Sequence, residues 1–228
     1  MKNIITGIAL FSFPYFVFAE LNIASEILIG KTQNKVHSSI QTEVSEDHYS
    51  SSLKSDSLGL RLGIDVTDNF AIELSKHDHG DVVNNFTISI PTMAPPSPSG
   101  PIFLPPEFDT IVEARIPIDL ESLRVGVKGQ MEIFEKVSVN ARLGLAHWSY
   151  GEFTPQKLTN VGASSSSGES GNDLYYSFGA EYKFTENFYL GFEYSLFTIN
   201  ESSGDKNSVS GSYKHEVKDL SLVLGWEF

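Results

Sequence analysis

A histidine and a serine stand two residues apart at His147-Trp148-Ser149, and Glu152 follows closely. On a β-strand, positions i and i+2 lie on one face, so the imidazole and the hydroxyl would be neighbours. Nucleophilic catalysis needs a base within about 3 Å of the hydroxyl and a further group that orients the base. The pattern therefore makes hydrolysis one candidate activity, with Ser149 as the nucleophile.

A second candidate is the segment His77-Asp78-His79-Gly80-Asp81. Two histidines at i and i+2 can share a face and bind a metal together with a carboxylate. Histidines at the polar rim of a strand are more often simply solvated. We therefore expect neither a metal nor a cofactor.

Composition narrows the function classes. The chain of 228 residues has 16 Lys+Arg against 29 Asp+Glu, a formal net charge of −13. This balance disfavours nucleic-acid binding, which needs clustered positive charge. The sequence has no cysteine, which excludes disulfides, thiolate nucleophiles and zinc–thiolate sites.

The N-terminus has the pattern of an export signal. Lys2 is followed by an apolar run from Ile4 to Phe18 and by the small residue Ala19. We predict a signal peptide over residues 1–19 and one domain over 20–228. No other segment approaches the roughly 20 apolar residues of a spanning helix, so residence in a membrane would have to come from strands.

Three hairpins organise the rest of the chain. Segments 60–74, 131–143 and 178–192 each alternate apolar and polar residues around a tight polar turn. Longer polar or Pro-rich stretches at 34–52, 80–108, 152–172 and 200–208 are predicted loops. Three turns and four loops connect eight strands, which we predict at 21–33, 53–66, 69–79, 110–133, 137–151, 173–184, 187–199 and 209–228.

Short turns on one side and long loops on the other are typical of an outer-membrane barrel. We predict an all-β fold, an eight-stranded antiparallel transmembrane up-and-down β-barrel with both termini periplasmic. A soluble β-sandwich or lipocalin-like barrel is the alternative. In the membrane, apolar faces such as that of Leu58, Leu60 and Leu62 meet lipid. The aromatic residues expected to form interfacial girdles are Phe70, Trp148, Tyr150, Tyr175, Tyr176, Phe188 and Trp226.

The last nine residues form the predicted eighth strand. Its apolar face, which ends the chain on an aromatic, consists of Leu220, Leu222, Leu224, Trp226 and Phe228. The pattern resembles the terminal strand of Gram-negative outer-membrane barrels, which the barrel-assembly machinery reads. To close a barrel, this strand must pair with the first strand near Ile27 and Ile29.

Two hairpins resemble the OmpA family. Residues 128–148 are similar to the central hairpin of the OmpA transmembrane domain, including its Lys-to-Arg interval and the Arg-Leu-Gly that precedes Trp. Residues 179–194 resemble the next hairpin, where Gly-x-Glu-Tyr and a later Glu-Tyr frame the turn. The family's best-known members add a peptidoglycan-binding domain; because this chain stops at Phe228, we expect the transmembrane domain only.

The resemblance implies a charge cluster in the lumen. It places Glu73, Lys128, Arg142 and Glu181 on four strands with their side chains pointing inward. Buried charges must pair, and the cluster is either a static polar core or a salt-bridge gate of a narrow pore. The arginine that the family places after the third turn is Gly191 here, so a gate would lack that partner.

Lipid A deacylases are also eight-stranded barrels with a His-x-Ser pair, which His147 and Ser149 resemble. Their pattern continues with Asn where this chain has Tyr150, which weakens the match. The stretch 80–108 holds seven of the ten prolines, interleaved with apolar residues. It either folds over the barrel mouth, offers a sticky surface to a host molecule or phage, or packs only on itself.

We predict a non-enzymatic outer-membrane barrel that contributes to envelope integrity and to surface interaction or adhesion through its loops. A small low-conductance porin and a lipid A-modifying hydrolase are the alternatives. The expected partners are outer-membrane lipid and lipopolysaccharide, the barrel-assembly machinery, periplasmic chaperones, and a host-surface or phage ligand at the loops.

Overall fold

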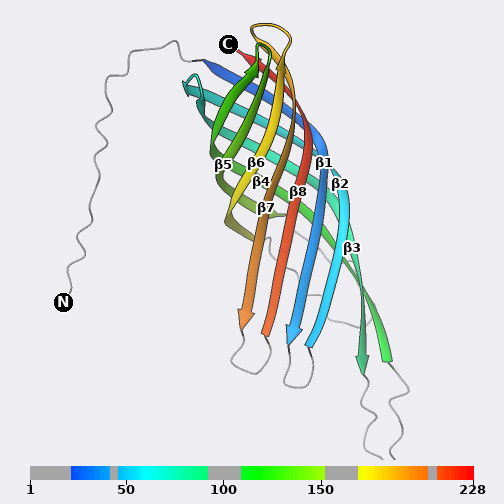
Figure 1. The fold of residues 1–228 in the computed structure, drawn as a ribbon. Coiled ribbons are helices and arrows are strands. Elements are labelled where there is room, and N and C mark those ends of the chain that lie inside the picture. Colours follow the sequence, from blue (N-terminus) through cyan, green and yellow to red (C-terminus); the bar gives the residue numbers. More distant parts are fainter. Residues whose placement is uncertain (1–21, 42–45, 92–108, 152–168, 205–209) are drawn as a thin grey trace, which may run out of the picture.

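Eight antiparallel strands close into a single barrel in the order β1 to β8 (Figure 1). The structure, a computed structural model, describes residues 22–41, 46–91, 109–151, 169–204 and 210–228. The strands are β1 (Ile23–Gln41), β2 (Glu46–Thr67), β3 (Phe70–Pro91), β4 (Asp109–Phe134), β5 (Val137–Tyr150), β6 (Ser170–Lys183), β7 (Phe188–Gly204) and β8 (Ser210–Glu227). The predicted barrel is confirmed, and the soluble sandwich is wrong.

The last strand closes the barrel onto the first. Ile27 on β1 pairs with Leu224 on β8, and Ile29 pairs with Leu222. The backbone N–H of Phe228 donates to the carbonyl of Ile23 at 2.9 Å, so the pairing runs to the last residue. The seam between β1 and β8 lies where the sequence predicts it.

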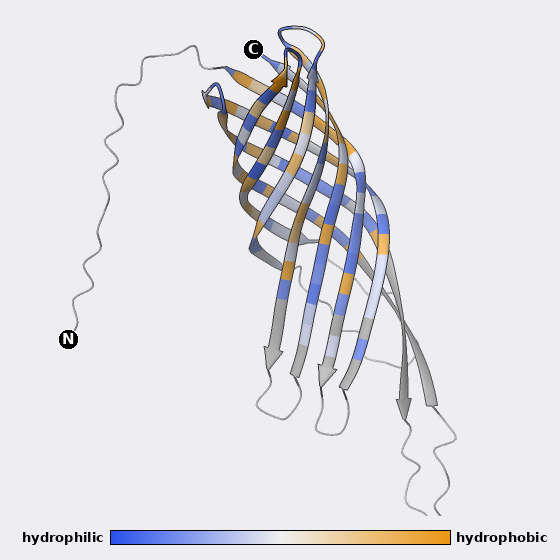
Figure 2. Ribbon diagram, in the orientation of Figure 1, coloured by the Kyte–Doolittle hydropathy of each residue, from blue (hydrophilic) through white to orange (hydrophobic). Residues whose placement is uncertain are grey.

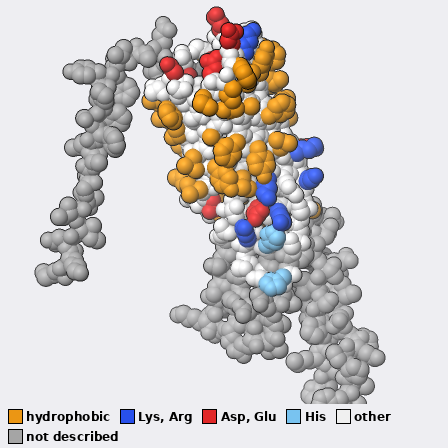
Figure 3. Space-filling model, viewed as in Figure 1, with side chains coloured by type: hydrophobic (Ala, Val, Ile, Leu, Met, Phe, Trp, Pro, Cys, Tyr) orange, Lys and Arg blue, Asp and Glu red, His pale blue; other side chains and the backbone are white. Residues whose placement is uncertain are grey.

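In its turn-side half the barrel is apolar outside and polar inside, the reverse of a protein folded in water. On β2, Leu60 and Leu62 are 60% and 58% exposed, whereas Arg61 between them is 3% exposed. Period-2 alternation causes this inversion because successive side chains point to opposite faces. Hydrophobic side chains form a band around the half of the barrel nearer the short turns (Figures 2 and 3). Within the described residues, no helix is long and apolar enough to cross a membrane.

Two of the short turns share the pattern Thr-acidic-Asn-Phe and use it in the same way. In Thr67-Asp68-Asn69-Phe70 the threonine Oγ1 accepts from the backbone N–H of Phe70 at 3.1 Å. In Thr185-Glu186-Asn187-Phe188 the equivalent distance is 3.0 Å. In both turns the asparagine amide donates to a carbonyl of the adjacent strand. Local side-chain hydrogen bonds therefore define the turns.

The strands are longer than predicted on the side of the long connections. The polar stretch 34–52 belongs largely to β1 and β2, and residues 80–91 extend β3. A β-bulge between Asp78 and Asp81 accommodates Gly80, whose φ is +72°. A serine- and asparagine-rich sequence is typical of a loop, but here the backbone pairing between the strands continues through it. The expected signal peptide (1–19) and residues 92–108 of the Pro-rich stretch lie outside the described residues.

Only part of the aromatic set lies on the outer surface. Phe70, Tyr176 and Trp226 are exposed, and Trp226 contacts both Phe188 and Phe228 with ring centroids 6.2 and 6.5 Å apart. Trp148 and Tyr175 point inward instead and are 3% and 2% exposed. The prediction that these two join a girdle is therefore wrong.

Candidate functional site

Seven charged side chains meet inside the turn-side half of the barrel, one from each of the first seven strands. We call this set the charge layer. Each member is between 2% and 6% exposed, so all seven are shielded from solvent. In strand order, the charge layer consists of Glu26, Arg61, Glu73, Lys128, Arg142, Glu181 and Glu193.

Arg61 links carboxylates from across the barrel. Its Nη1 donates to Glu26 Oε2 at 2.5 Å, and its Nη2 donates to Glu193 Oε1 at 2.7 Å. Its Nε lies 3.7 Å from Glu73 Oε2, within ion-pair range. One guanidinium therefore holds β1, β3 and β7 to β2.

Arg142 is a second hub. Its Nε donates to Glu73 Oε2 at 2.8 Å, and its Nη1 lies 3.0 Å from Glu193 Oε2. Its Nη2 is 3.4 Å from both Glu26 Oε1 and Glu181 Oε1. The planar guanidinium suits this role because it presents five donors in fixed directions. All four carboxylates therefore contact Arg142.

Lys128 completes the charge layer. Its Nζ is 2.9 Å from Glu181 Oε1 and lies 5.6 Å from the ring centroid of Tyr189. The hydroxyl of Tyr189 in turn donates to Glu26 Oε1 at 2.6 Å. Asn140 donates to Glu181 Oε1 at 2.6 Å. Neutral side chains thus add hydrogen bonds to carboxylate oxygens that the cations also contact.

The four residues predicted for the lumen, Glu73, Lys128, Arg142 and Glu181, lie together in the charge layer. Glu26, Arg61 and Glu193 are not among the residues predicted for the lumen. Strand parity contains the signal, since Arg61 and Glu193 each lie between outward hydrophobic residues and Glu26 precedes the outward Ile27.

Gly191 has no room for the arginine that the resemblance places there. A Cβ at Gly191 would come within 2.7 Å of the Ala180 carbonyl oxygen and 3.0 Å of Glu181 Cγ, so the position is too crowded for a longer side chain. The second arginine therefore comes from β2 rather than from the strand after the third turn.

A second polar group lies on the loop side of the charge layer. His79 Nδ1 is 3.1 Å from Asp219 Oδ1, and His79 Nε2 is 2.8 Å from Ser122 Oγ. Arg124 Nη2 donates to Asp219 Oδ2 at 3.2 Å, and Arg124 Nε donates to Ser122 Oγ at 3.2 Å. Thr32 Oγ1 also donates to Asp219.

Serine, histidine and aspartate in this order are the groups of a catalytic triad. Here, however, Ser122 is 2% exposed and His79 is fully buried, and the Arg124 guanidinium lies against the serine hydroxyl. The arrangement fills the barrel and cross-links its strands. His77 and His79 point inward with stacked rings, so the expectation of solvated rim histidines is wrong. No potential metal-binding cluster of His, Cys, Asp or Glu is present in the part of the chain that the structure describes.

Mainly apolar side chains fill the interior beyond His79, together with the fully buried, hydrogen-bonded pair Asn34 and His215. On β8 and β4, the next inward residues on the loop side are Val217 and Leu120, both 0% exposed. The ring centroids of Tyr175 and Phe197 lie 5.2 and 5.1 Å from the Arg124 guanidinium carbon, so these two rings are the first apolar side chains beyond the polar group. The apolar plug consists of Val36, Val82, Ile118, Leu120, Ala146, Trp148, Tyr175, Phe197, Ile199 and Val217.

His147 and Ser149 lie on the outward side of β5 near its loop end. His147 Nδ1 lies 3.0 Å from Asn172 Oδ1 on β6, and no hydrogen bond joins His147 to Ser149 among the described residues. Glu152 is outside the described residues. The nucleophile–base contact that hydrolysis would need is therefore not formed by this pair.

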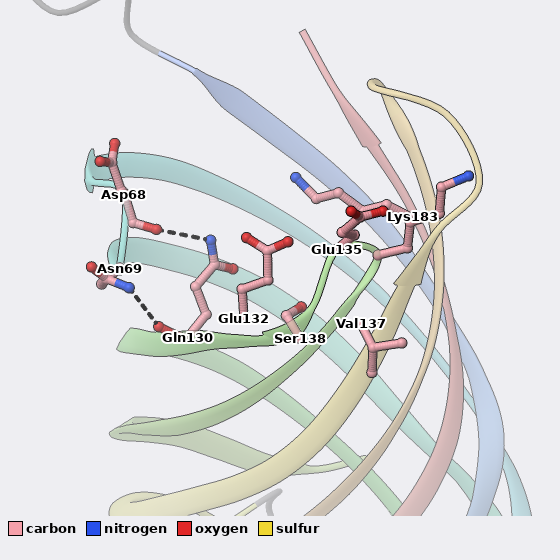
Figure 4. A pocket seen from close by; sticks show the side chains of 9 residues that line it. Asp68, Asn69, Gln130, Glu132, Glu135, Val137, Ser138 and Lys183 are labelled. Atoms are coloured by element: carbon pink, nitrogen blue, oxygen red, sulfur yellow. Dashed lines mark hydrogen bonds between the residues drawn. The ribbon is translucent and has the colours of Figure 1, made fainter.

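A polar hollow lies at the turn end of the barrel (Figure 4). Gln130 anchors one wall by donating to the carbonyl of Asp68 at 3.2 Å and accepting from the Asn69 side chain at 3.1 Å. The residues that line the hollow are all exposed or half-buried, whereas those of the charge layer are buried. The lining residues are Asp68, Asn69, Gln130, Glu132, Glu135, Lys136, Val137, Ser138 and Lys183.

Comparison with known proteins gives one family and several solved structures. A family model described as "Outer membrane protein beta-barrel domain" matches residues 30–228. OprG from Pseudomonas aeruginosa is 12% identical with a TM-score of 0.53, covering 90% of this chain and 95% of that chain. At this identity the similarity concerns the fold alone. No curated protein matches the chain.

Two further solved structures are similar over most of their length. Ail from Yersinia pestis, solved with the heparin analogue sucrose octasulfate, is 17% identical with a TM-score of 0.44, covering 90% of this chain and 99% of that chain. The outer membrane protease OmpT from Escherichia coli is 11% identical with a TM-score of 0.46, covering 91% of this chain and 97% of that chain.

Proposed function

The chain belongs to the outer membrane protein β-barrel domain family, and we propose that it is a non-enzymatic barrel that stabilises the envelope and carries surface interactions on its loops. The observation that carries this proposal is the filled interior. An eight-stranded barrel has a lumen just wide enough for side chains. Here the charge layer, the His79–Asp219 group and the apolar plug occupy it in succession.

The plug argues against the low-conductance porin. A hydrated ion that crossed the barrel would have to break the buried ion pairs of Arg61 and Arg142 and then pass between Leu120, Phe197 and Val217. Apolar surface offers no replacement for the hydration shell. The charge layer then acts as a static cross-link between strands rather than as a gate.

Planar-bilayer recording tests this assignment. We expect purified protein to give no discrete conductance steps, and we expect Glu73→Gln and Arg142→Gln to add none. Leu120→Ala, which opens the plug without touching a charge, serves as the matched comparison. Reproducible steps in the unmodified protein that change with Glu73→Gln would contradict the proposal and favour the porin.

The mass of lipid A tests the hydrolase alternative. Lipid A extracted from cells that express the protein should have the same mass as lipid A from cells that lack it. Ser149→Ala and Ser122→Ala test the surface pair and the buried triad separately. A lipid A mass shift that either substitution abolishes would establish an enzyme and identify its nucleophile.

We also propose that the short turns and both termini face the periplasm, which would put the long connections outside the cell. Both β1 and β8 have their terminal ends at the turn end of the barrel (Figure 1). The absence of native cysteine makes labelling unambiguous. A membrane-impermeant maleimide should label Ser212→Cys in intact cells and should not label Glu135→Cys. The reverse pattern would overturn this orientation.

The proposed surface ligand is a host molecule or phage receptor-binding protein, and the Pro-rich connection is its proposed site. Deleting residues 94–106 leaves β3 and β4 intact, since those strands end at Pro91 and begin at Asp109. Binding of cells or phage should fall in this variant and persist when residues 205–209 are deleted. Equal binding by the two variants would exclude the Pro-rich connection as the site.

A further inference from the structure

The outer surface changes character at the loop-side border of the apolar band. On β1 the outward positions pass from Ile27 and Ile29 to Lys31 and Lys35. On β8, read toward the loops, Leu220 is followed by Lys218. Lysine therefore takes the first outward position beyond the band on both strands that form the barrel seam.

The strand register joins these lysines into one patch. Gln33 on β1 lies opposite Lys218 on β8 and opposite Lys54 on β2, so three adjacent strands contribute at the same level. Figure 3 shows basic side chains gathered below the orange band on this side of the barrel. We call Lys31, Lys35, Lys54, Lys214 and Lys218 the lysine patch.

The lysine patch keeps a positive charge although the chain carries a net charge of −13. Glu216 lies 2.8 Å from Lys214 and 3.3 Å from Lys218, and Asp56 lies 2.5 Å from Lys31. Hydrogen bonds from Lys214 and Lys218 hold the pKa of Glu216, which lies beyond the apolar band, at about 2.

Five lysines and two acids give the patch a formal charge of +3. Within the described residues, no ion pair engages Lys35 or Lys54. The patch therefore has cationic groups available for a ligand.

The neighbouring strands carry the opposite charge at the same height. On β3 and β4, Asp78, Asp81, Asp119 and Glu121 face outward with Lys76, which lies 3.1 Å from Glu121. Partial burial raises the pKa of Asp119, and its acidic neighbours raise it further. The positive charge is thus confined to β8, β1 and β2.

The position of the lysine patch along the membrane normal indicates which ligand it can bind. Successive outward residues on a strand are about 7 Å apart, or about 5 Å along the membrane normal for a strand tilted by 35–45°. Lys31 therefore lies at the level where lipid phosphates begin, Lys54 and Lys218 lie one outward position beyond it, and Lys35 and Lys214 lie further out. Acyl chains on Ile29 and Leu220 would place a headgroup directly against these ammonium groups.

We propose that the lysine patch binds the phosphate groups of a phosphorylated glycolipid of the lipid A type in the leaflet at the loop end. The proposal rests on the orientation given under the proposed function. Continuity with the apolar band favours a lipid over a soluble polyanion, because a polyanion in solution would gain nothing from Ile29 or Leu220.

Titration of the detergent-solubilised barrel with bisphosphorylated lipid A tests the patch. The variant carries Lys35→Gln, Lys54→Gln and Lys218→Gln. The matched control carries Lys76→Gln, Lys136→Gln and Lys183→Gln and has the same net charge. Each basic residue near an anionic surface contributes about fivefold to affinity, so the patch variant, which lacks three of them, should bind roughly a hundredfold more weakly. The control should bind as tightly as the unmodified protein.

Three further ligands distinguish lipid A binding from the binding of other anions. Dephosphorylated lipid A should bind all variants equally weakly, and inorganic phosphate should compete poorly. If a sulfated polysaccharide binds more tightly than lipid A and depends on the same three lysines, the patch serves a soluble polyanion and the proposal fails. Equal loss in variant and control would also overturn it. A heat-dependent gel shift must show that both variants are folded.

This test is independent of the orientation. Lipid A binding in detergent does not depend on which end of the barrel faces outward, whereas cysteine labelling in cells does. Binding lost in the patch variant together with labelling of Glu135→Cys would retain the patch and reject the orientation. No lysine dependence with labelling of Ser212→Cys would reject the patch alone.

Discussion

Gly225 on β8 lies directly opposite Tyr189 on β7, and a Cβ at Gly225 would overlap the tyrosine ring. β8 is the one strand that adds no charge to the charge layer. Instead, its glycine leaves room for the ring, which is 1% exposed and supports the hydroxyl that donates to Glu26. The eighth strand thus contributes space where the other seven contribute charge.

Gly225→Ala should destabilise the barrel by about 1–3 kcal/mol, the usual cost of overpacking a filled interior. The added methyl would displace Tyr189 and remove its hydrogen bond to Glu26. Urea unfolding in lipid vesicles measures the change. Gly63→Ala is the control, because a Cβ there meets its nearest atom at an ordinary 3.5 Å. Equal stability of the two variants would contradict the steric role of Gly225.

Arg61→Met should cost about 3–5 kcal/mol, because it leaves Glu26 and Glu193 as buried carboxylates with a cation removed. Adding Glu193→Gln to Arg61→Met should recover part of the loss, since one unpaired charge is then removed. The measurement is again unfolding in vesicles, analysed as a double-mutant cycle.

Lys183→Met provides the control for this cycle. Lys183 pairs with Glu227 at 2.9 Å, but its side chain is 41% exposed. An ion pair in such a position contributes about 0–1 kcal/mol. If Arg61→Met cost no more than Lys183→Met, the charge layer would not be the cross-link that its burial indicates.

The sequence determines the strands and their faces through alternation, but it does not determine which inward residues meet. Leu58 to Val66 alternate so regularly that one face of β2 must be apolar. By contrast, Glu26 and Arg142 lie on β1 and β5, and their ion pair depends on the stagger of the whole closed barrel. Pairwise contacts across a lumen are therefore hard to derive from local patterns.

The misplaced aromatics show a different limit. Trp148 lies six residues from Arg142, and Tyr175 lies six residues before Glu181, so strand parity puts both inside. Their position near strand ends favours a girdle, but it carries no information about the face. Whether a residue is odd or even within its strand decides if the side chain points into the barrel or out of it. The position of the residue along the strand decides only its height along the barrel axis.

Thr185→Ala should destabilise the barrel by about 1 kcal/mol because the backbone N–H of Phe188 loses the hydroxyl that it donates to. Thr67→Ala should have a similar effect through Phe70, and the double variant should show the sum, since the turns share no partner. Thr185→Ser keeps the hydroxyl and is the control. A loss as large with serine as with alanine would assign the effect to the methyl group instead.

Phe228→Ala should reduce assembly in cells far more than it reduces stability. The side chain is 71% exposed, so its removal leaves no cavity, and the backbone hydrogen bond to Ile23 remains. Unfolding in vesicles should therefore change by less than about 1 kcal/mol, whereas the amount of heat-modifiable protein in outer-membrane fractions should fall severalfold. Phe134→Ala is the matched control, since Phe134 is 70% exposed at the end of β4, the same end of the barrel. If both variants assembled equally well, the terminal aromatic would not be the signal that the barrel-assembly machinery reads.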